Sequence, residues 1–238
     1  MNTNLAREEV VDVVDDVVAN IYALDNTTTN EGVLKRQSPY KYIKRMMDAV
    51  LSIIALVVLS PIFLIIAIAI KVESKGPVFF KHTRIGKDGK IIKLYKFRSM
   101  VMNAEELIKT FTPEQMKEYK ENYKLTDDPR ITKVGKFLRK TSLDELPQLL
   151  NIIKGDLAII GPRPVVEGEL KKYGQNSEKF LSVTPGLTGY WAANGRSCTT
   201  YEQRMQMELY YIDNLSLKMD IKVFFKTIEA VIKREGAI

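Results

Sequence analysis

The chain has 238 residues, of which 45% are hydrophobic and 27% charged, so it can bury a sizeable core and is not a disordered chain. Its 36 basic and 29 acidic residues give a net charge of +7, which favours anionic partners such as phosphate groups, acidic lipid or nucleic acid. A single cysteine and a single histidine, Cys198 and His82, exclude internal disulfides, multi-cysteine metal sites and histidine-based zinc sites.

Residues 1–40 form an acidic N-terminal extension. They carry a net charge of −4, which leaves +11 on residues 41–238. Aliphatic residues at helical spacing in residues 10–24 predict a helix, and residues 25–32 have the composition of a linker. Such a helix could dock on a partner, but we favour a loosely packed, mobile extension. A signal peptide is not expected, because no basic start leads directly into an apolar run.

The apolar segment covers residues 49–70. As a helix, these 22 residues are about 33 Å long, which is enough to cross a hydrocarbon core of about 30 Å. Ser60 and Pro61 lie at its middle, where proline removes a backbone donor and kinks a helix. Basic residues flank both ends, and the positive-inside tendency places both in the cytoplasm. We therefore predict a re-entrant, Ser-Pro-broken membrane helix over residues 41–75, with a kinked spanning helix as the alternative.

Residues 76–238 are expected to form one cytoplasmic domain of the α/β (α+β) class. Two segments rich in β-branched and aromatic residues, 77–85 and 90–97, flank a Gly-Lys-Asp-Gly turn and predict a β-hairpin. Residues 103–124 predict polar helical structure with a new helix starting at a Thr-Pro pair. Residues 217–232 predict an amphipathic helix with a basic back, which either lies on the bilayer surface or packs on the domain core.

Asp144 and Glu145 are the first candidate chemical groups. Pro147 cannot lie deep in a helix, so the helix through residues 148–153 begins within about one turn upstream and places both acids at its N-terminus. A capping box between Ser142 and Glu145 is the simpler explanation of this spacing. The basic residues in the preceding segment favour a site that holds a phosphate and a divalent cation beside a carboxylate. These residues are Arg130, Lys133, Lys136, Arg139 and Lys140.

Two later segments carry further candidates. In Gly161-Pro-Arg-Pro164 the proline that follows Arg163 keeps it extended, and its guanidinium suits a phosphate, although a plain loop turn explains the sequence equally well. Residues 185–196 contain three glycines, the only tryptophan and a terminal Arg196. Such a loop can bring backbone close to a ligand while an aromatic side chain stacks on a ring.

The order and spacing of these segments closely resemble those of the bacterial sugar transferases called monotopic phosphoglycosyl transferases, over about residues 41–235. Besides the broken apolar segment, the matching runs are Lys81-His-Thr-Arg-Ile-Gly86, Tyr95-Lys-Phe-Arg-Ser-Met100, Asp128-Pro-Arg-Ile-Thr-Lys-Val-Gly135, Ser142-Leu-Asp-Glu-Leu-Pro147, Lys154-Gly-Asp156, Gly161-Pro-Arg-Pro164 and Pro185-Gly-Leu-Thr-Gly-Tyr-Trp191. The resemblance implies a re-entrant helix in the membrane lipid, at the cytoplasmic face of the bacterial inner membrane. It also implies transfer of a sugar-1-phosphate from a UDP-sugar to polyprenyl (undecaprenyl) phosphate with release of UMP, which initiates a surface glycan or exopolysaccharide.

The resemblance also implies roles for individual residues. Asp144 would be the nucleophile that forms a covalent aspartyl-phosphosugar intermediate, kept ionised by its basic neighbours, and Glu145 would bind Mg²⁺. The positions expected to be functional or to face substrate phosphates are Lys96, Arg139, Arg163, Arg196 and Glu208. Two departures from the family pattern, Ala192 for the usual glutamine and Glu208-Leu for the usual Leu-Asp, leave the nucleophile untouched and bear on nucleoside or sugar contacts.

Two other functions stay open from the sequence. One is a membrane-bound, Mg²⁺-dependent phosphatase or pyrophosphatase that uses the same carboxylates on water. The other is a non-enzymatic polysaccharide assembly factor whose extension binds a partner. Nucleic-acid binding is disfavoured, because the basic residues are interleaved with proline-fixed loops and an apolar segment. The sequence does not decide the sugar, the role of residues 1–40, or whether the chain forms a homo-oligomer or binds glycan-assembly partners.

Overall fold

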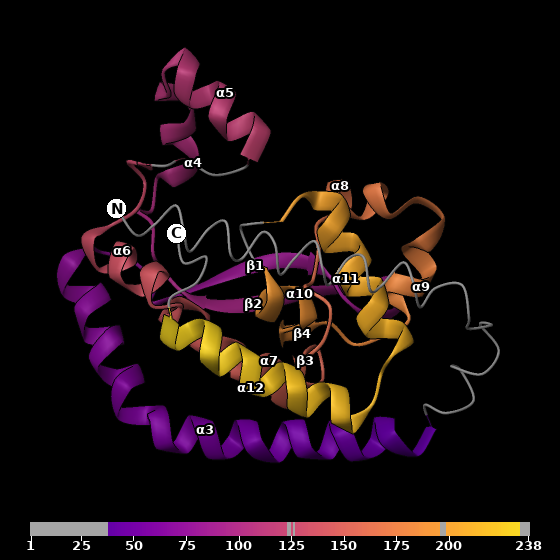
Figure 1. Ribbon diagram of the computed structural model, residues 1–238. Helices are drawn as coiled ribbons and strands as arrows, with labels where there is room; N and C mark the ends of the chain where they lie inside the picture. The colour runs from indigo at the N-terminus through magenta and orange to yellow at the C-terminus, as the bar shows by residue number, and fades with distance from the viewer. Residues whose placement is uncertain (1–37, 123–124, 126, 196–198, 234–238) are drawn as a thin grey trace.

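The computed structural model describes residues 38–122, 125, 127–195 and 199–233, which mix helices with two small sheets (Figure 1). The elements in chain order, with η marking 3-10 helices, are α3 (Ser38–Glu73), β1 (Phe79–Ile85), η1 (Lys87–Gly89), β2 (Ile91–Phe97), α4 (Ala104–Leu107), η2 (Ile108–Thr110), α5 (Pro113–Asn122), α6 (Lys133–Lys140), η3 (Leu143–Gln148), α7 (Leu149–Lys154), β3 (Ala158–Ile160), α8 (Glu167–Leu170), η4 (Lys171–Asn176), α9 (Ser177–Leu181), β4 (Gly186–Thr188), α10 (Tyr190–Asn194), α11 (Tyr201–Asp213) and α12 (Leu217–Lys233). This mixture agrees with the predicted α/β (α+β) class. The expectations for residues 1–37 and for Arg196 lie outside the described residues.

Helix α3 contains the predicted apolar segment and is long and apolar enough to cross a membrane. Large aliphatic side chains are exposed along it, with Val57 at 69% and Leu64 at 62%. Pro61 lies inside α3, and the helix continues through it without interruption. Figure 1 shows that α3 changes direction along its course and that the rest of the domain lies inside the bend. The helix also includes residues 38–40, which the sequence analysis places in the extension.

Both ends of α3 are bonded to the same domain. Near its start, the Arg45 guanidinium donates to the backbone carbonyls of Ile152 and Ile153, at 2.7 and 2.6 Å, and so caps the last turn of α7. At its other end, the Glu73 carboxylate accepts the backbone N–H of Val134 at 3.1 Å, in the first turn of α6. The domain therefore fixes the position of both arms of the bent helix.

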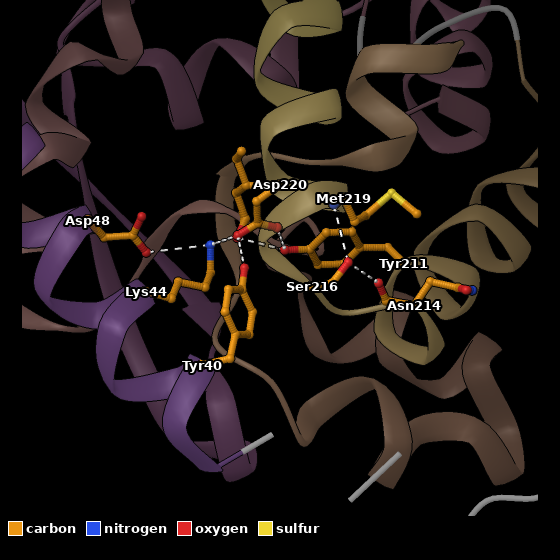
Figure 2. A network of polar contacts seen from close by, with 9 residues as sticks. Tyr40, Lys44, Asp48, Tyr211, Asn214, Ser216, Met219 and Asp220 are labelled. Carbon is orange, nitrogen blue, oxygen red and sulfur yellow. Dashed lines mark hydrogen bonds and ion pairs between the residues drawn. The ribbon is translucent and has the colours of Figure 1, made fainter. Parts of the chain in front are cut away.

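A buried polar network joins the start of α3 to α11 and α12 (Figure 2). The Asp220 carboxylate lies at its centre and accepts hydrogen bonds from Tyr40 at 2.5 Å, Lys44 at 2.5 Å and Tyr211 at 2.6 Å. Lys44 also pairs with Asp48 at 3.6 Å. Because Asp220 and Tyr211 are buried, loss of the carboxylate would leave several donors without an acceptor. The network thus holds α3 against the domain.

The predicted hairpin is confirmed as an antiparallel pair whose register runs from Phe79 opposite Phe97 to Ile85 opposite Ile91. A second, parallel pair joins β3 and β4, with Ala158 opposite Gly186. These strands lie between the helices, and the largest cluster of buried side chains packs β3 against α9, α11 and α12. The two small sheets therefore form the frame on which the later loops are held.

The remaining helix predictions also agree with the structure. Pro113 begins α5, and the Thr112 hydroxyl accepts the backbone N–H of Gln115 at 3.2 Å, as expected for a Thr-Pro helix start. Helix α12 packs on the core through Val223, which has no exposed surface, while Phe225 on the same helix is 65% exposed. The packing alternative therefore holds for one face of α12, and its outer face still presents large apolar side chains.

Candidate active site

Asp144 and Glu145 lie in η3, which leads directly into α7. The helical segment begins within one turn of Pro147, as the proline predicts. The capping-box interpretation is wrong: Ser142 has a left-handed backbone with φ of 55°, and its side chain accepts no capping hydrogen bond. A capping residue is normally extended, and only that geometry aims its hydroxyl at the N–H groups of the first turn. The two acids are therefore not explained by helix capping.

The two carboxylates converge on Lys96 of β2. The Lys96 Nζ atom lies 2.6 Å from Glu145 Oε1 and 3.9 Å from Asp144 Oδ2. All three side chains keep a little exposure, between 12% and 27%, so a ligand can reach them. The fold thus places Lys96 of β2 beside two adjacent acids of η3 that lie at least 48 positions later in the sequence.

Oxygen ligands for a divalent cation are present but few. Within the described ranges, no group of three or more histidine, cysteine or acidic side chains could hold a metal ion. Mg²⁺ commonly uses one or two protein carboxylates and completes its coordination with water and substrate phosphates. The Asp144–Glu145 pair fits this mode of binding, in which the ion arrives with a phosphorylated ligand.

Burial dominates the ionisation of Asp144. It raises the pKa of the Asp144 carboxyl above its ordinary value, and the charge of Glu145 acts in the same direction. Lys96 and Arg139 lower the pKa but do not outweigh burial. Burial therefore opposes the basic neighbours that the sequence analysis expected to keep Asp144 ionised, and its ionised state stays a prediction. The expected basic neighbours are nevertheless in place, and the shift makes the carboxylate a stronger base when it is ionised.

Arg139 reaches the site because α6 lies directly against the backbone of Ser99. A Cβ atom at Gly135 would lie 2.0 Å from the Ser99 carbonyl oxygen, so only glycine permits this approach. From the next turn, Arg139 Nε donates to the Ser99 hydroxyl at 2.9 Å. The glycine in the Asp128–Gly135 run thus has a steric role in placing Arg139 near Asp144.

Asn151 is a residue that the sequence analysis missed. Its side chain has no exposed surface and forms two hydrogen bonds with the backbone of β2, as a neighbouring strand would. Nδ2 donates to the Lys93 carbonyl at 2.8 Å, and Oδ1 accepts the Tyr95 N–H at 2.9 Å. These bonds join α7 to β2 in the residues just before Lys96. Asn151 therefore sets the distance between Lys96 and the acids of η3.

Arg163 and Glu208 belong to a second group of charged residues. The Arg163 backbone N–H donates to Glu208 Oε1 at 3.0 Å, and Glu208 is 1% exposed. The other oxygen, Oε2, has no hydrogen-bond partner in the part of the chain that the structure describes. Burial raises the pKa of Glu208 to about 7. Glu208, predicted to bind substrate, thus holds the backbone of the Gly-Pro-Arg-Pro loop.

Three arginines surround Glu169 and Trp191 in this second group. Glu169 pairs with Arg84 at 3.4 Å and with Arg204 at 3.1 Å. The guanidinium of Arg204 lies 4.7 Å from the centre of the Trp191 ring, and that of Arg163 lies 5.9 Å from it. The sequence analysis missed Arg204, although its spacing of one helical turn from Glu208 on α11 could have identified it.

Glycines bring the two loops of this second group together. A Cβ atom at Gly186 would lie 2.1 Å from the Gly161 nitrogen, and one at Gly189 would lie 2.2 Å from the Gly161 carbonyl oxygen. No side chain fits at these contacts. The close approach sets Trp191, just after the glycine loop, beside Arg163, just after Gly161.

The two groups are close enough to interact electrostatically. After burial, the charges of Arg84, Lys96 and Arg163 are the main causes that lower the pKa of His82 to about 4. The charge of Glu145 also acts on Arg84. The predicted residues Lys96, Asp144, Glu145 and Arg139 therefore form one end of a continuous charged region, and Arg163 with Glu208 forms the other.

Comparison with protein families matches residues 39–234 to the family described as Bacterial sugar transferase. The chain is 45% identical over 197 residues to the exopolysaccharide production protein ExoY of Sinorhizobium fredii, covering 82% of this chain and 87% of that protein. It is 42% identical over 206 residues to the undecaprenyl-phosphate galactose phosphotransferase of Salmonella typhimurium, covering 85% of this chain and 43% of that protein. It is 41% identical over 197 residues to the UDP-glucose:undecaprenyl-phosphate glucose-1-phosphate transferase of Escherichia coli, covering 79% and 40%. The chain thus spans less than half the length of the last two relatives.

Proposed function

This chain belongs to the bacterial sugar transferase family, and we propose that it transfers a sugar-1-phosphate from a UDP-sugar to polyprenyl phosphate and releases UMP. The names of the Salmonella and Escherichia relatives, which specify undecaprenyl phosphate and sugar-phosphate transfer, support this reaction. The observation that carries the proposal is the convergence of Asp144 and Glu145 on Lys96, in a domain bound to a long apolar helix. The product would initiate a surface glycan.

In the proposed mechanism, the Asp144 carboxylate attacks the β-phosphorus of the donor. The bond from that phosphorus to the bridging oxygen breaks, UMP leaves with the electron pair, and an aspartyl-phosphosugar forms. A phosphate oxygen of the lipid acceptor then attacks the same phosphorus and releases the Asp144 carboxylate. Lys96 and Arg139 stabilise the negative charge on the transferring group in both steps.

Glu145 is the residue that we expect to hold Mg²⁺. Its carboxylate lies beside Asp144, and donor phosphate oxygens would complete the coordination. When bound, the ion neutralises charge on the diphosphate and makes it a better electrophile. The residues of the chain then have to orient the donor and keep Asp144 in line with its β-phosphorus.

We propose that α3 is a re-entrant helix at the cytoplasmic face of the bacterial inner membrane, and its attachment supports the re-entrant course. Arg45 and Glu73, near opposite ends of α3, both bond to the same domain. A helix that crossed the bilayer would place its ends on opposite sides of about 30 Å of hydrocarbon, where one polar domain cannot reach both. Pro61 and the bend of α3 fit a helix that enters and leaves through one leaflet.

The test is UMP release from a panel of UDP-sugars with undecaprenyl phosphate and Mg²⁺, together with mass analysis of the protein after exposure to donor alone. Asp144→Asn should abolish both UMP release and the sugar-phosphate adduct at position 144. Asp127→Asn, which changes a carboxylate with a 97% exposed side chain, is the matched control and should keep both. Normal turnover by Asp144→Asn would overturn the proposal.

Omission of the lipid separates the transferase from a hydrolase that uses the same carboxylates. Without acceptor, a transferase releases at most about one UMP per enzyme molecule, because the adduct cannot pass on its sugar phosphate. Sustained release of UMP and sugar phosphate into water would identify a pyrophosphatase instead. The sugar that gives the fastest release in the panel identifies the donor.

A further inference from the structure

Strand β1 connects the two ends of the charged region. Phe80, His82 and Arg84 occupy alternate positions, so they lie on one face of the hairpin. The register places Phe80 directly opposite Lys96, and directly opposed residues project from the same face of an antiparallel pair. At the other end of the strand, Arg84 pairs with Glu169 in the arginine group. The row therefore runs from an aromatic side chain beside Lys96 to the arginines around Trp191.

Phe80 is the apolar member of this row and is exposed. Its relative exposure is 53%, although the Lys96 side chain opposite it lies against the carboxylates of Asp144 and Glu145. Its ring contacts His82, with ring centres 5.9 Å apart, and His82 is neutral at neutral pH because its pKa is lowered to about 4. The preceding residue, Phe79, faces the other side of the hairpin and stacks on Phe97 at 5.4 Å. Phe80 thus presents its ring beside the charged site rather than into the core.

The position of Phe80 in the chain relates it to the membrane helix. It lies seven residues after Glu73, the last residue of α3, at the start of β1. The Phe63 ring of α3 packs on Phe97 with ring centres 5.1 Å apart, and Phe97 follows Lys96 directly. These rings lie on the face of the hairpin opposite Phe80 and Lys96, so α3 packs from the other side against the strand end that carries both residues.

We propose that Phe80 binds the first isoprene units of the lipid acceptor, so that the site has a lipid end at Phe80 and a nucleotide end at Arg84, Arg163 and Trp191. This inference rests on the proposed function. A polyprenyl phosphate joins an anionic head directly to an apolar chain, so its binding site needs a cation and an apolar surface side by side. Opposed Cβ atoms in a strand pair lie about 5 Å apart, which matches that requirement at Lys96 and Phe80.

The donor nucleotide matches the other end of the row. A UDP-sugar carries two phosphates and an aromatic base and has no apolar chain. The three arginines can pair with the phosphates, and the Trp191 ring can stack on the base. Because the donor has no apolar chain, this end needs no exposed aliphatic or phenylalanine side chain. The two substrates would therefore approach Asp144 from opposite ends of β1, each with its phosphate at Lys96.

The test separates the two half-reactions in detergent, where binding to a bilayer plays no part. Phe80→Ala should form the Asp144 adduct from UDP-sugar at the wild-type rate within about twofold, while its KM for polyprenyl phosphate rises about tenfold. Phe80→Leu, which keeps an apolar side chain, should recover most of the affinity. Ile91→Ala is the matched control, because Ile91 is 68% exposed at the far end of the same hairpin, and its KM for the lipid should not change.

Each outcome distinguishes the inference from the proposed function. Absence of an adduct in the wild-type protein defeats the proposed function itself. A normal adduct in Phe80→Ala with an unchanged acceptor KM would overturn the inference that Phe80 binds the lipid and would leave the proposed function intact. An unchanged KM in detergent together with weaker binding to phospholipid vesicles would assign Phe80 to the bilayer surface and would also overturn it. Slower adduct formation would place Phe80 on the donor side, with the same consequence.

Discussion

The two ends of the charged region differ in how they are built. Asp144 and Glu145 are adjacent in the sequence, partly exposed, and paired with one lysine. The group around Arg163 and Glu208 comes from β1, α8, α10, α11 and the Gly-Pro-Arg-Pro loop, and several of its polar atoms are buried without a hydrogen-bond partner among the described residues. Unpaired buried polar atoms are costly, and their presence at this end is consistent with its proposed role in binding the donor. The first end is suited to chemistry and the second to recognition.

We expect the largest effect from substitution of the glycines that bring the two loops of the recognition end together. Gly186→Ala would place a Cβ atom 2.1 Å from the Gly161 nitrogen, so we expect the free energy of unfolding to fall by more than about 3 kcal/mol. Gly168→Ala is the control, since no atom beyond its own helix backbone and chain neighbours lies within 4 Å of its added Cβ. Thermal unfolding in detergent measures both variants, and equal stability of the two would show that the loops do not depend on this approach.

Asn151 provides the corresponding test of the chemical end. Asn151→Leu leaves the Lys93 carbonyl and the Tyr95 N–H without their buried partner, which should cost about 3 kcal/mol of unfolding free energy. Because Lys96 follows directly, the rate of adduct formation should fall more than the stability loss explains at temperatures at which the variant is folded. A folded variant with the wild-type rate would show that Asn151 supports the fold only.

Substitution of Lys96 tests whether this residue acts at the chemical end through its charge or through packing. Lys96→Gln should slow adduct formation about a hundredfold, as for loss of one charge-stabilising group. It should also move the acid limb of the pH–rate profile to higher pH, because Lys96 lowers the pKa of Asp144 and its removal leaves only Arg139 and a backbone hydrogen bond to oppose burial. Lys96→Arg should restore part of both effects, and Lys93→Gln, on the exposed side of β2, should cause neither. A profile that does not move would separate Lys96 from the ionisation of Asp144.

Glu208 gives the smallest expected effect and reports on the recognition end. Its pKa is about 7 in the folded protein and near 4.5 when unfolded, so the folded state binds more protons between these values and loses stability as pH rises. Between pH of about 5 and 7 the loss should be about 2 kcal/mol. Glu208→Gln keeps an acceptor for the Arg163 N–H and should remove this dependence. Glu105→Gln, at an exposed position on α4, should retain the wild-type slope in thermal unfolding.

Local features explain what could be predicted from the sequence. The apolar segment of α3, the hairpin around the Gly-Lys-Asp-Gly turn and the start of α5 at Pro113 all depend on neighbours within a few residues. Pro147 similarly places Asp144 and Glu145 at the beginning of a helical segment, wherever the rest of the chain lies. Periodicity, turn residues and proline act through the local backbone, so the sequence alone determines these elements.

Only the tertiary structure decided how the site is assembled. The pairing of Lys96 with the acids, the strand-like bonds of Asn151 and the meeting of Arg84 with Arg204 at Glu169 join segments that are far apart along the chain. The same applies to the pKa of Asp144, since burial depends on everything packed around the side chain rather than on its sequence neighbours. Long-range packing and desolvation are properties of the folded whole, and no local pattern encodes them.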